Sequence, residues 1–243
     1  MSLSHPLPLP SPGLVRNRLL RALPPPELEQ LWPQMERVSL AVRSIIMKAE
    51  APVETVYFME EGTVSMIKPL LDGAQIEVGI VGFEGMIGLP VLFGAPTSLM
   101  ETVVQVEGCA LRLSSAAFRA ALHELPGLMP VMLRYVDSVQ SSLAQSAACN
   151  ARHQIDQRLA RWILMMHDRI GGDSFRIRQE FMSIMLGVRR PGVTLALGAL
   201  QRAGLVIHSK GVMQVLDRRG LETACCECYR AVQHRFEWLE EQK

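Results

Sequence analysis

The alternation of hydrophobic and polar positions changes character several times along this chain of 243 residues. Residues 14–36 carry leucines at helical spacing around three consecutive prolines, which predicts two short helices because proline breaks a helix. From about residue 38 to residue 113 the pattern becomes short runs rich in β-branched residues. Glycines punctuate these runs, with turn signals at Glu61-Gly62, Asp72-Gly73, Gly82, Gly94 and Gly108. Such spacing predicts a β-barrel or roll.

After residue 125 the strand pattern stops, and apolar residues step alternately by four and three positions. This 3.5-residue repeat is typical of a coiled-coil seam and lasts for about three heptads. Two interpretations remain open, namely a helix that pairs with a second copy of the chain and a helix that packs on its own β domain. The candidate dimer residues are Leu125, Met129, Met132, Val136, Val139 and Leu143.

Two further helices are predicted between residues 179 and 203. Phe181, Ile184 and Met185 form one apolar face, Gly187 interrupts it, and residues 193–200 form a second face with i, i+3, i+4, i+7 spacing. Two β-rich runs around Lys210 then predict a hairpin. This order is that of a winged helix-turn-helix, whose second helix enters the DNA major groove. A helical hairpin packed inside a core is the alternative.

Charge is distributed unevenly, although the whole chain carries a net charge of +1. Residues 1–150 hold 10 Lys/Arg against 14 Asp/Glu, a net of −4, whereas residues 151–220 hold 12 against 5, a net of +7. Neutralisation of phosphates supplies most of the non-specific affinity for DNA. A basic block that coincides with the predicted helix-turn-helix therefore favours DNA binding over a merely packed hairpin.

Composition, with 49% apolar residues, predicts a soluble globular protein of two modest domains. Residues 1–13 are rich in proline and have no basic start and no continuous apolar run, so we expect a flexible arm, not a signal peptide or a membrane span. The five cysteines are odd in number and unevenly spaced, which favours a reducing cytoplasm over a disulfide framework.

Three segments carry a family resemblance: GFEGMIGL at residues 82–89, CNARHQIDQRLARW at residues 149–162, and QEFMSIMLGVRRPGVT at residues 179–194. Over residues 14–220 the chain resembles the Crp/Fnr superfamily of bacterial transcription regulators, in particular a branch with Arg-Arg at the start of the recognition helix and a C-terminal Cys-Glu-Cys-Tyr. The resemblance implies an α+β fold with an N-terminal cyclic-nucleotide-binding-like β-roll, a long dimerisation helix and a C-terminal winged helix-turn-helix. It also implies a homodimer on a palindromic operator in double-stranded DNA, with RNA polymerase as a further partner.

These observations together predict five regions. They are a flexible arm at 1–13, a β-roll sensory domain at 14–124, a dimerisation helix at 125–150, a winged helix-turn-helix at 151–220 and a C-terminal helix at 221–243.

The resemblance also implies an effector pocket in the β-roll, gated by a signal that the sequence does not identify. Its candidate residues are Glu84, Gly85, Met86, Gly88 and Ser98. In members that bind cyclic AMP, a glutamate holds the ribose and an arginine holds the phosphate. Alignment puts Met86 and Ser98 at these two positions, and no Lys or Arg lies between residues 68 and 112 to replace the arginine. We therefore expect no cyclic AMP and no assigned cofactor, with a cyclic dinucleotide left as a candidate. Glu84 is equally consistent with a turn carboxylate.

The candidate DNA-binding residues are Arg178, Gln179, Arg189, Arg190, Gly192, Thr194 and Lys210. Pro191 suits the first turn of a helix, so the two arginines before it project from the helix end that enters the groove. By the resemblance, Arg190 aligns with a base-reading arginine and contacts a guanine, while Arg189 holds the DNA backbone. Thr194 contacts a thymine methyl or a phosphate. Arg178 contacts a phosphate or only solvent.

The half-site should differ from that of the catabolite activator protein, the best-known member of the superfamily. Two positions that align with its polar base-reading residues are Pro191 and Leu195, which cannot form hydrogen bonds to bases.

Two alternative functions are kept. One is a constitutive DNA-binding regulator whose β-roll is purely structural. The other is a metal or thiol redox sensor that uses Cys225, Cys226 and Cys228, since Cys225-x-x-Cys228 has ligand spacing and His234 follows. The same segment has a helical pattern that packs one face, so no metal site is assigned. The sequence has no P-loop, G-x-S-x-G elbow, H-E-x-x-H pair or dinucleotide fingerprint, and we expect no enzyme.

Overall fold

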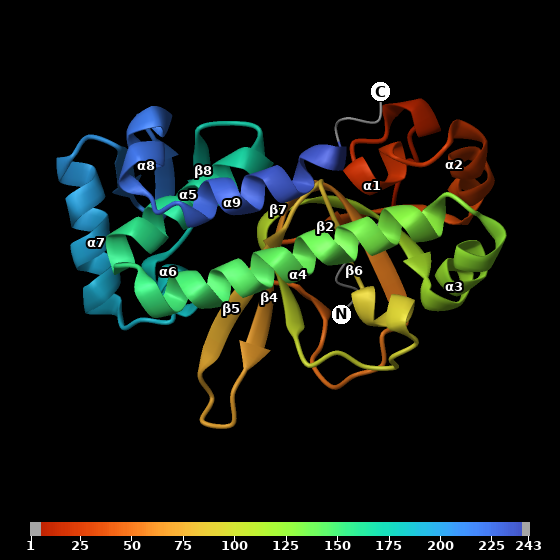
Figure 1. Ribbon diagram of the computed structural model, residues 1–243, viewed down its shortest axis with the longest axis horizontal. Coiled ribbons are helices and arrows are strands. Elements are labelled where there is room, and N and C mark those ends of the chain that lie inside the picture. Colours follow the sequence, from red (N-terminus) through yellow and green to blue (C-terminus); the bar gives the residue numbers. More distant parts are fainter. Residues whose placement is uncertain (1–5, 240–243) are drawn as a thin grey trace.

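The computed structural model describes residues 6–239, and its N-terminal half is a β domain (Figure 1). Seven strands form one antiparallel sheet in the order β1-β2-β7-β4-β5, with β3 beside β7 and β6 beside β4. The strands are β1 (Pro6–Leu7), β2 (Glu36–Leu40), β3 (Ile45–Met47), β4 (Thr55–Pro69), β5 (Gln75–Val81), β6 (Met86–Ile87) and β7 (Glu101–Ser114). The sheet folds around a core of apolar side chains, which confirms the predicted β-roll.

Two of the predicted turns are β-bulges inside long strands. The runs on either side of Gly62 form the single strand β4, and those on either side of Gly108 form β7. The pairing register between the two strands shifts at Glu61 and Thr63, and Gly62 has φ +78°. A Cβ on Gly108 would collide with the carbonyl oxygen of Glu61, so the two glycines allow the backbones to approach where the strands bend. Glycine inside a strand often marks a bulge, and at these two positions the strand continues on both sides of the glycine.

Short helices close one end of the roll. They are α1 (Arg18–Arg21), α2 (Pro25–Leu31) and α3 (Ser115–Glu124), with 3-10 turns at Pro12–Leu14, Trp32–Gln34 and Leu89–Phe93. The two N-terminal helices were predicted, and Asn17 caps the first by accepting a hydrogen bond from the amide of Leu20. Their leucines are buried against Phe58, Phe118 and the start of the long helix α4 (Leu128–Arg152).

Part of the arm predicted at residues 1–13 contacts the β domain. Pro6 and Leu7 pair with the edge strand β2, and the indole nitrogen of Trp32 donates to the carbonyl oxygen of Pro10 at 2.9 Å. An unpaired sheet edge offers free backbone groups, and this segment satisfies part of that edge. Residues 1–5 of the expected arm lie outside the described residues.

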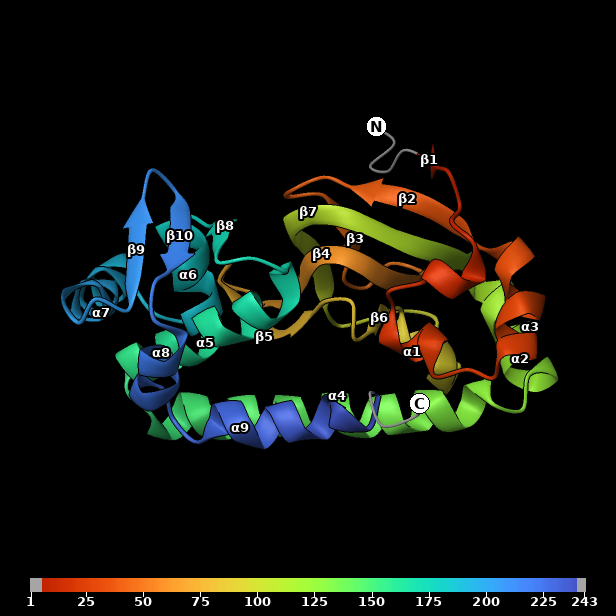
Figure 2. The same cartoon turned by 90° about the horizontal axis from the view of Figure 1, so that it is seen from above.

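Helix α4 runs along the length of the molecule and reaches the C-terminal domain (Figure 2). This domain contains α5 (Ile155–Ile170), β8 (Ser174–Arg176), α6 (Gln179–Leu186), α7 (Arg190–Arg202), β9 (Val206–Ser209) and β10 (Val212–Val215). The predicted hairpin is present as β9 and β10, and β8 adds a third strand beside β10. No helix within residues 6–239 is both long enough and apolar enough to cross a membrane.

The C-terminal segment is not one helix. It forms α8 (Arg218–Ala224) and α9 (Cys228–Gln233), followed by a 3-10 turn at His234–Leu239, while the last residues of the expected helix, 240–243, lie outside the described residues. The backbone turns away at Cys225, where φ is −78° and ψ is 167°. This break lets α8 pack on α5 and sends α9 back along α4 (Figures 1 and 2).

Candidate functional site

The helix pair α6–α7 presents one polar face outward. Helix α7 buries Val193, Ala196, Leu197 and Leu200, as the spacing predicted, and exposes Leu195 on the opposite side. Helix α6 buries Met182, Met185 and Leu186, whereas Phe181 and Ile184 are half-buried. The buried face of α6 is therefore rotated from the predicted one, because α5 and α7 both pack on the side that carries Met182 and Met185.

The beginning of α7 holds the two adjacent arginines. Arg189 is the N-cap residue and Arg190 the first helical residue, and both are exposed. The Arg190 guanidinium donates to a carboxylate oxygen of Glu180, on α6, at 2.5 Å. Thr194, one turn later, donates to the carbonyl oxygen of Arg190 at 3.1 Å and lies 3.3 Å from the Gln179 side-chain oxygen. These residues thus form one exposed polar group.

Gly192, which the sequence placed among the DNA contacts, does not face outward. A Cβ at this position would lie 3.3 Å from Cδ1 of Ile155 at the start of α5. Gly192 is half-buried, because its position on the helix turns it toward α5 of its own domain.

The hairpin β9–β10 places Lys210 at an exposed tip. Lys210 and Gly211 have φ of +50° and +75°, which suits a tight two-residue hairpin turn. Arg178 is exposed at the N-cap of α6 and, with Arg176 and Lys210, lines a cavity of about 870 Å³ whose opposite wall includes Arg43 of the β domain. Arg178 and Lys210 therefore lie together as a second basic group, formed by the start of α6 and the tip of the hairpin.

The expected effector residues are largely engaged within the protein. The Tyr135 hydroxyl of α4 contacts the backbone of Met86, accepting from its amide at 3.1 Å and lying 3.2 Å from its carbonyl oxygen. A Cβ on Gly85 would collide with this hydroxyl. Met86 is itself buried in the core. Burial and the charge of Glu84 raise the pKa of Tyr135, so the hydroxyl stays protonated and can donate to the carbonyl oxygen of Met86.

The remaining two positions are also occupied. Gly88 has φ +104°, a conformation that favours glycine, and its Cβ would lie 2.8 Å from a methyl carbon of Val56. Ser98 is buried, and its hydroxyl accepts from the amide of Met100 at 3.0 Å. The ammonium group of Lys68 donates to the carbonyl oxygen of the next residue, Leu99, at 3.2 Å.

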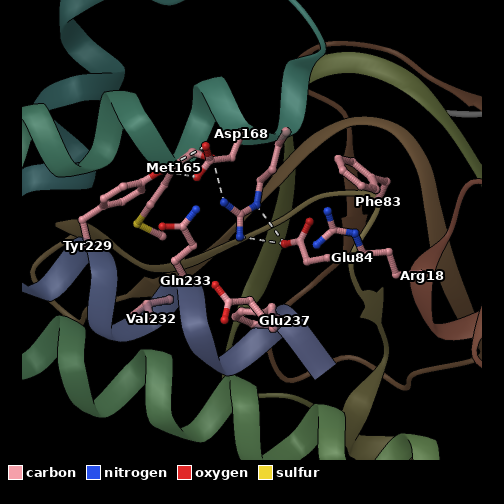
Figure 3. A pocket seen from close by; sticks show the side chains of 11 residues that line it. Arg18, Phe83, Glu84, Met165, Asp168, Tyr229, Val232, Gln233 and Glu237 are labelled. Atoms are coloured by element: carbon pink, nitrogen blue, oxygen red, sulfur yellow. Dashed lines mark hydrogen bonds and ion pairs between the residues drawn. The ribbon is translucent and has the colours of Figure 1, made fainter. Parts of the chain in front are cut away.

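Glu84 is part of a buried ion pair with the C-terminal domain. Its carboxylate lies 2.8 Å from the guanidinium of Arg169, on α5, and accepts from the amide of Gly82 at 3.2 Å (Figure 3). The two side chains are only 6% and 9% exposed. Both residues line a cavity of about 240 Å³ between the β domain, α5 and α9. Figure 3 shows Glu84 among the labelled side chains of this cavity. Glu84, which the sequence left as either an effector residue or a turn carboxylate, thus connects two domains.

A second buried carboxylate also connects β5 to α5. Glu77 accepts hydrogen bonds from Ser65 at 2.5 Å, from Gln105 at 3.0 Å and from the indole nitrogen of Trp162 at 3.0 Å. Burial raises the pKa of Glu77 to about 7, although these donors oppose the increase. The sequence pattern gave no signal for this residue, since a single glutamate in a strand usually faces solvent.

The six predicted heptad residues do not share one environment. Leu125 precedes the helix, and it and Met132 are buried in the core of their own chain, while Val139 and Leu143 pack against that core. Met129 and Val136 are half-buried, and the neighbouring Leu133 is 56% exposed. Leu125 and Met132 therefore cannot contribute to a dimer interface without rearrangement, because the chain itself already covers them. The outward apolar stripe is Met129, Leu133 and Val136.

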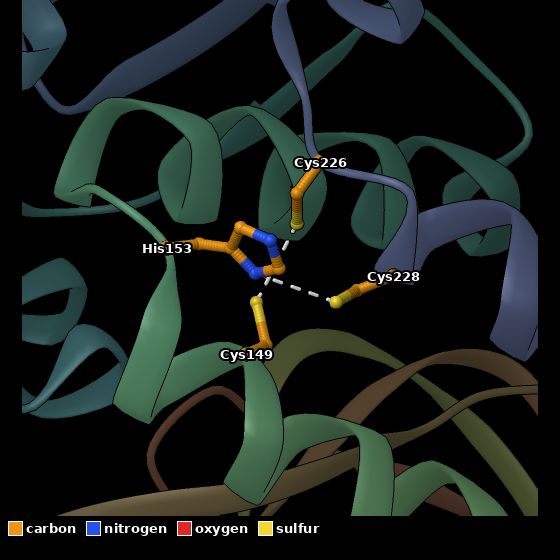
Figure 4. Close-up of side chains that lie close together, drawn as sticks. All are labelled: Cys149, His153, Cys226 and Cys228. Atoms are coloured by element: carbon orange, nitrogen blue, oxygen red, sulfur yellow. Dashed lines mark hydrogen bonds between the residues drawn. The ribbon is translucent and has the colours of Figure 1, made fainter.

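Four metal-binding side chains meet at the junction of α4 and α5. The sulfurs of Cys149, Cys226 and Cys228 and a ring nitrogen of His153 all lie within 4.8 Å of one another (Figure 4). Cys225 is outside this group, with its thiol directed to the carbonyl oxygen of Glu222, and His234 pairs with Glu237. The cysteine set expected from the sequence is thus corrected, because the break between α8 and α9 separates Cys225 from Cys228.

Sequence reasoning missed Cys149 and His153. Their i, i+4 spacing at the end of a helix was the available signal. The cysteines that complete the group lie far away in the sequence, with 77 positions between Cys149 and Cys226. Burial raises the pKa of the Cys226 thiol to about 12, and the hydrogen bond with Cys149 adds to this. A protonated thiol is a poor nucleophile, so this shift lowers the reactivity of Cys226 itself.

Two family models match separate parts of the chain. The model of the cyclic nucleotide-binding domain matches residues 37–124, and that of the Crp-like helix-turn-helix domain matches residues 157–224. A search among curated proteins finds no significant match.

Solved structures share the fold at low sequence identity. TTHB099, a transcriptional regulator of the CRP family from Thermus thermophilus, is 23% identical with a TM-score of 0.62, over 76% of this chain and 95% of that one. FixK2 from Bradyrhizobium japonicum is 16% identical with a TM-score of 0.64, over 79% and 98% of the two chains. CLP, a c-di-GMP responsive global regulator from Xanthomonas campestris, is 15% identical with a TM-score of 0.63, over 79% and 99%.

Proposed function

Since the chain belongs to the Crp/Fnr family of transcription regulators, we propose that it binds a palindromic operator as a homodimer and that a signal in the β domain gates this binding. The observation that carries the proposal is the outward face of α7, where exposed Arg189, Arg190 and Thr194 begin a helix within a block of net charge +7. A helix that buries one face and directs basic side chains from its first turn suits the major groove. Contact with RNA polymerase and a cytoplasmic location belong to the same proposal.

The exposed residues of α6, α7 and the hairpin have two roles, base recognition and phosphate contact. Arg190 reads a guanine by a bidentate contact, and Leu195, which is 74% exposed, contacts an apolar base edge such as a thymine methyl. Arg189, Arg178 and Lys210 neutralise phosphates and fix the register on the duplex. Thr194 and Gln179 lie beside Arg190 and support its orientation.

The dimer seam follows the outward stripe of α4. Met129, Leu133 and Val136 are spaced by four and three residues, as in a coiled coil, and Leu133 among them is 56% exposed. Two copies joined along this stripe would present two recognition helices to two half-sites.

The gating signal would act through the contacts between the β domain and α5. The Glu84–Arg169 pair and the Glu77–Trp162 hydrogen bond both cross this boundary, so a ligand that alters the roll changes the position of the DNA-binding domain. Cyclic AMP lacks its phosphate ligand here. A cyclic dinucleotide is the class to test first, because CLP is described as c-di-GMP responsive.

A second candidate function is constitutive DNA binding with a structural roll. The contacts of Tyr135 with Met86 and of Arg169 with Glu84 favour it, since they already occupy the groups that would otherwise meet a ligand.

Selection of bound DNA from a random pool, repeated with and without nucleotides, tests both candidates. We expect a palindromic motif with a conserved guanine in each half-site, and a change in affinity of at least about tenfold with one nucleotide class. Tight binding that no nucleotide changes supports the constitutive candidate. Failure to enrich any motif excludes sequence-specific recognition. Calorimetry should give a Kd for cyclic AMP no tighter than about millimolar, because a buried phosphate without a cation is costly; micromolar binding would contradict the assignment of Met86 and Ser98.

A further inference from the structure

Four side chains from two distant parts of the chain converge where the DNA-binding domain begins. Cys149 lies in the last turn of α4, and His153 caps that helix. Cys226 lies on the connection between α8 and α9, and Cys228 is the first residue of α9 (Figure 4). We propose that they bind one Zn²⁺ as a closed Cys3His site, and that this metal clasps the C-terminal segment to the elbow between α4 and α5.

The spacing of the ligand atoms agrees with a tetrahedral zinc site. With Zn–S of about 2.3 Å and Zn–N of about 2.0–2.1 Å, tetrahedral geometry puts two sulfurs about 3.8 Å apart and a sulfur and a nitrogen about 3.6 Å apart. The Cys149 and Cys226 sulfurs lie 3.5 Å apart, and the Cys228 sulfur lies 3.5 Å from Nδ1 of His153. Small adjustments of side-chain torsions bring all four to ligand distance.

The surroundings orient the ligands as a metal site requires. With Nδ1 of His153 turned toward the sulfurs, its Nε2 lies 3.3 Å from a carboxylate oxygen of Glu227. A carboxylate on the far nitrogen of a ligating histidine fixes the tautomer that leaves the other nitrogen free to bind metal. The side-chain nitrogen of Gln145 donates to the Cys228 sulfur at 2.9 Å, an interaction that stabilises a metal-bound thiolate.

Charge near the cluster is complementary to the loaded site. Three thiolates and one Zn²⁺ leave a net charge of −1, and binding releases three thiol protons to solvent. Arg158 and Arg161 both have a buried Nε without a hydrogen-bond partner. Both guanidinium groups lie within electrostatic range of Cys149. Arg158 is half-buried and Arg161 is buried, so their positive charges cost desolvation free energy beside three neutral thiols. A metal centre of net charge −1 would compensate these charges.

A disulfide between Cys149 and Cys226 is the competing chemistry. It would use two of the four groups, and would leave unexplained why His153, Glu227, Gln145 and Cys228 are arranged around the same point. A four-ligand set with no open position favours a structural over a catalytic metal.

The clasp would hold the C-terminal segment against both parts that it joins. On one side, Arg218 of α8 pairs with Asp168 of α5 at 2.7 Å. On the other, the Ser138 hydroxyl of α4 donates to the carbonyl oxygen of Arg235 at 2.6 Å. The metal would lie between these two contacts. It would join the end of α4, at His153 directly before α5 begins, to the segment where α8 gives way to α9. Its presence would therefore fix the angle at which α5 leaves the long helix.

Metal analysis of the full-length protein, purified under reducing conditions and without chelator, tests the site directly. We expect about one Zn²⁺ per chain, and Co²⁺ in its place should give the absorption of a tetrahedral thiolate site. Cys149→Ser, Cys226→Ser and Cys228→Ser should each lose zinc by at least about tenfold in content or affinity. The matched control is Cys225→Ser, a neighbouring cysteine outside the cluster, which should keep full occupancy. His153→Cys should also retain zinc, because a fourth thiolate preserves the donor number.

Should the serine variants fail to fold, the wild-type protein and Cys225→Ser still decide the question. Zinc-free wild-type protein from zinc-supplemented growth, with no Co²⁺ absorption on titration, would overturn the proposal. So would a Cys149–Cys226 disulfide found by mass spectrometry in the freshly purified, non-reduced protein.

The clasp is tested by hydrogen exchange of the zinc-loaded and chelator-treated protein. Removal of zinc should lower protection about tenfold or more in residues 145–157 and 225–233, with the β domain unchanged. Bound zinc without any change in these segments contradicts the clasp. This inference rests on the proposed function only for its effect on DNA binding, so protein that binds zinc but no DNA would refute that function and leave the metal site in place.

Discussion

Arg190 and Glu180 form an exposed ion pair across the helix-turn-helix, with 2.5 Å between the guanidinium and a carboxylate oxygen. Both side chains are more than half exposed, so the pair contributes at most about 1 kcal/mol to stability. The arginine proposed to read DNA is thus held in the free protein by a partner that it can exchange for a guanine at small cost.

Removal of each of the two arginines at the start of α7 should affect DNA binding differently. Arg190→Ala should flatten the base preference at one symmetric pair of operator positions, since a bidentate guanine contact contributes about 1–3 kcal/mol of discrimination. Arg189→Ala should weaken specific and non-specific DNA alike and lower the salt slope by about one, because it removes one phosphate contact. Selection from a random pool and affinity against salt concentration measure the two effects.

Glu180→Gln is the control for this pair. It should retain the base preference and bind DNA a few-fold more tightly, because a negative charge near the phosphates is removed. An unchanged selected motif in Arg190→Ala would show that Arg189 or the hairpin around Lys210 carries the sequence recognition.

Charging the outward stripe of α4 should dissociate the dimer. In Leu133→Glu with Val136→Glu, like carboxylates would face one another across an apolar interface, and light scattering should report monomers. Operator affinity should fall steeply, since two half-sites are no longer bound together. The charge-matched control is Leu14→Glu with Leu99→Glu, two exposed leucines of the β domain. A dimer mass that survives the α4 changes would refute the proposed seam.

Stability should fall as the pH rises toward neutrality because of Glu77. Its pKa is raised from 4.5 to about 7 in the folded protein, so its protonated form is favoured by folding. The stabilisation is complete below the unfolded pKa and is lost as the pH rises through about 7. The pKa difference between the folded and unfolded states corresponds to up to about 3 kcal/mol in the free energy of unfolding. Glu77→Gln should remove this part of the pH dependence of Tm between pH 4.5 and 7, whereas Glu107→Gln, on an exposed side chain, should keep it. A parallel pH profile in Glu77→Gln and the wild type would disprove the assignment.

Breaking the buried pair between the domains should be costly. Arg169→Ala leaves the Glu84 carboxylate buried without its partner and should destabilise the protein by about 3–5 kcal/mol. Arg169→Met with Glu84→Gln should recover most of this loss, because neither charge remains. Arg190→Ala breaks an exposed pair and serves as the comparison, with an expected cost of at most about 1 kcal/mol. Calorimetric unfolding measures all three, and equal costs for the two single variants would mean that Glu84 is solvated.

The sequence by itself determined those features whose causes are local. The faces of α7, the N-terminal position of Arg190 and the hairpin around Lys210 follow from helical period, from proline at a first turn and from paired β-rich runs. Each depends on residues close together in the chain, so local chemistry alone decides it. The order of roll, long helix and helix-turn-helix was predictable for the same reason.

Only the tertiary structure decided which apolar face of a helix is buried and which distant residues pair. Helix α4 has apolar residues on more than one side, and only packing of the roll shows that Met132 faces inward and Leu133 outward. Glu84 meets Arg169 across 85 positions, and Cys149 meets Cys226 across 77. No sequence period links such pairs. Their contacts form only when packed cores fix the domains and the break at Cys225 returns the C-terminal segment to α4.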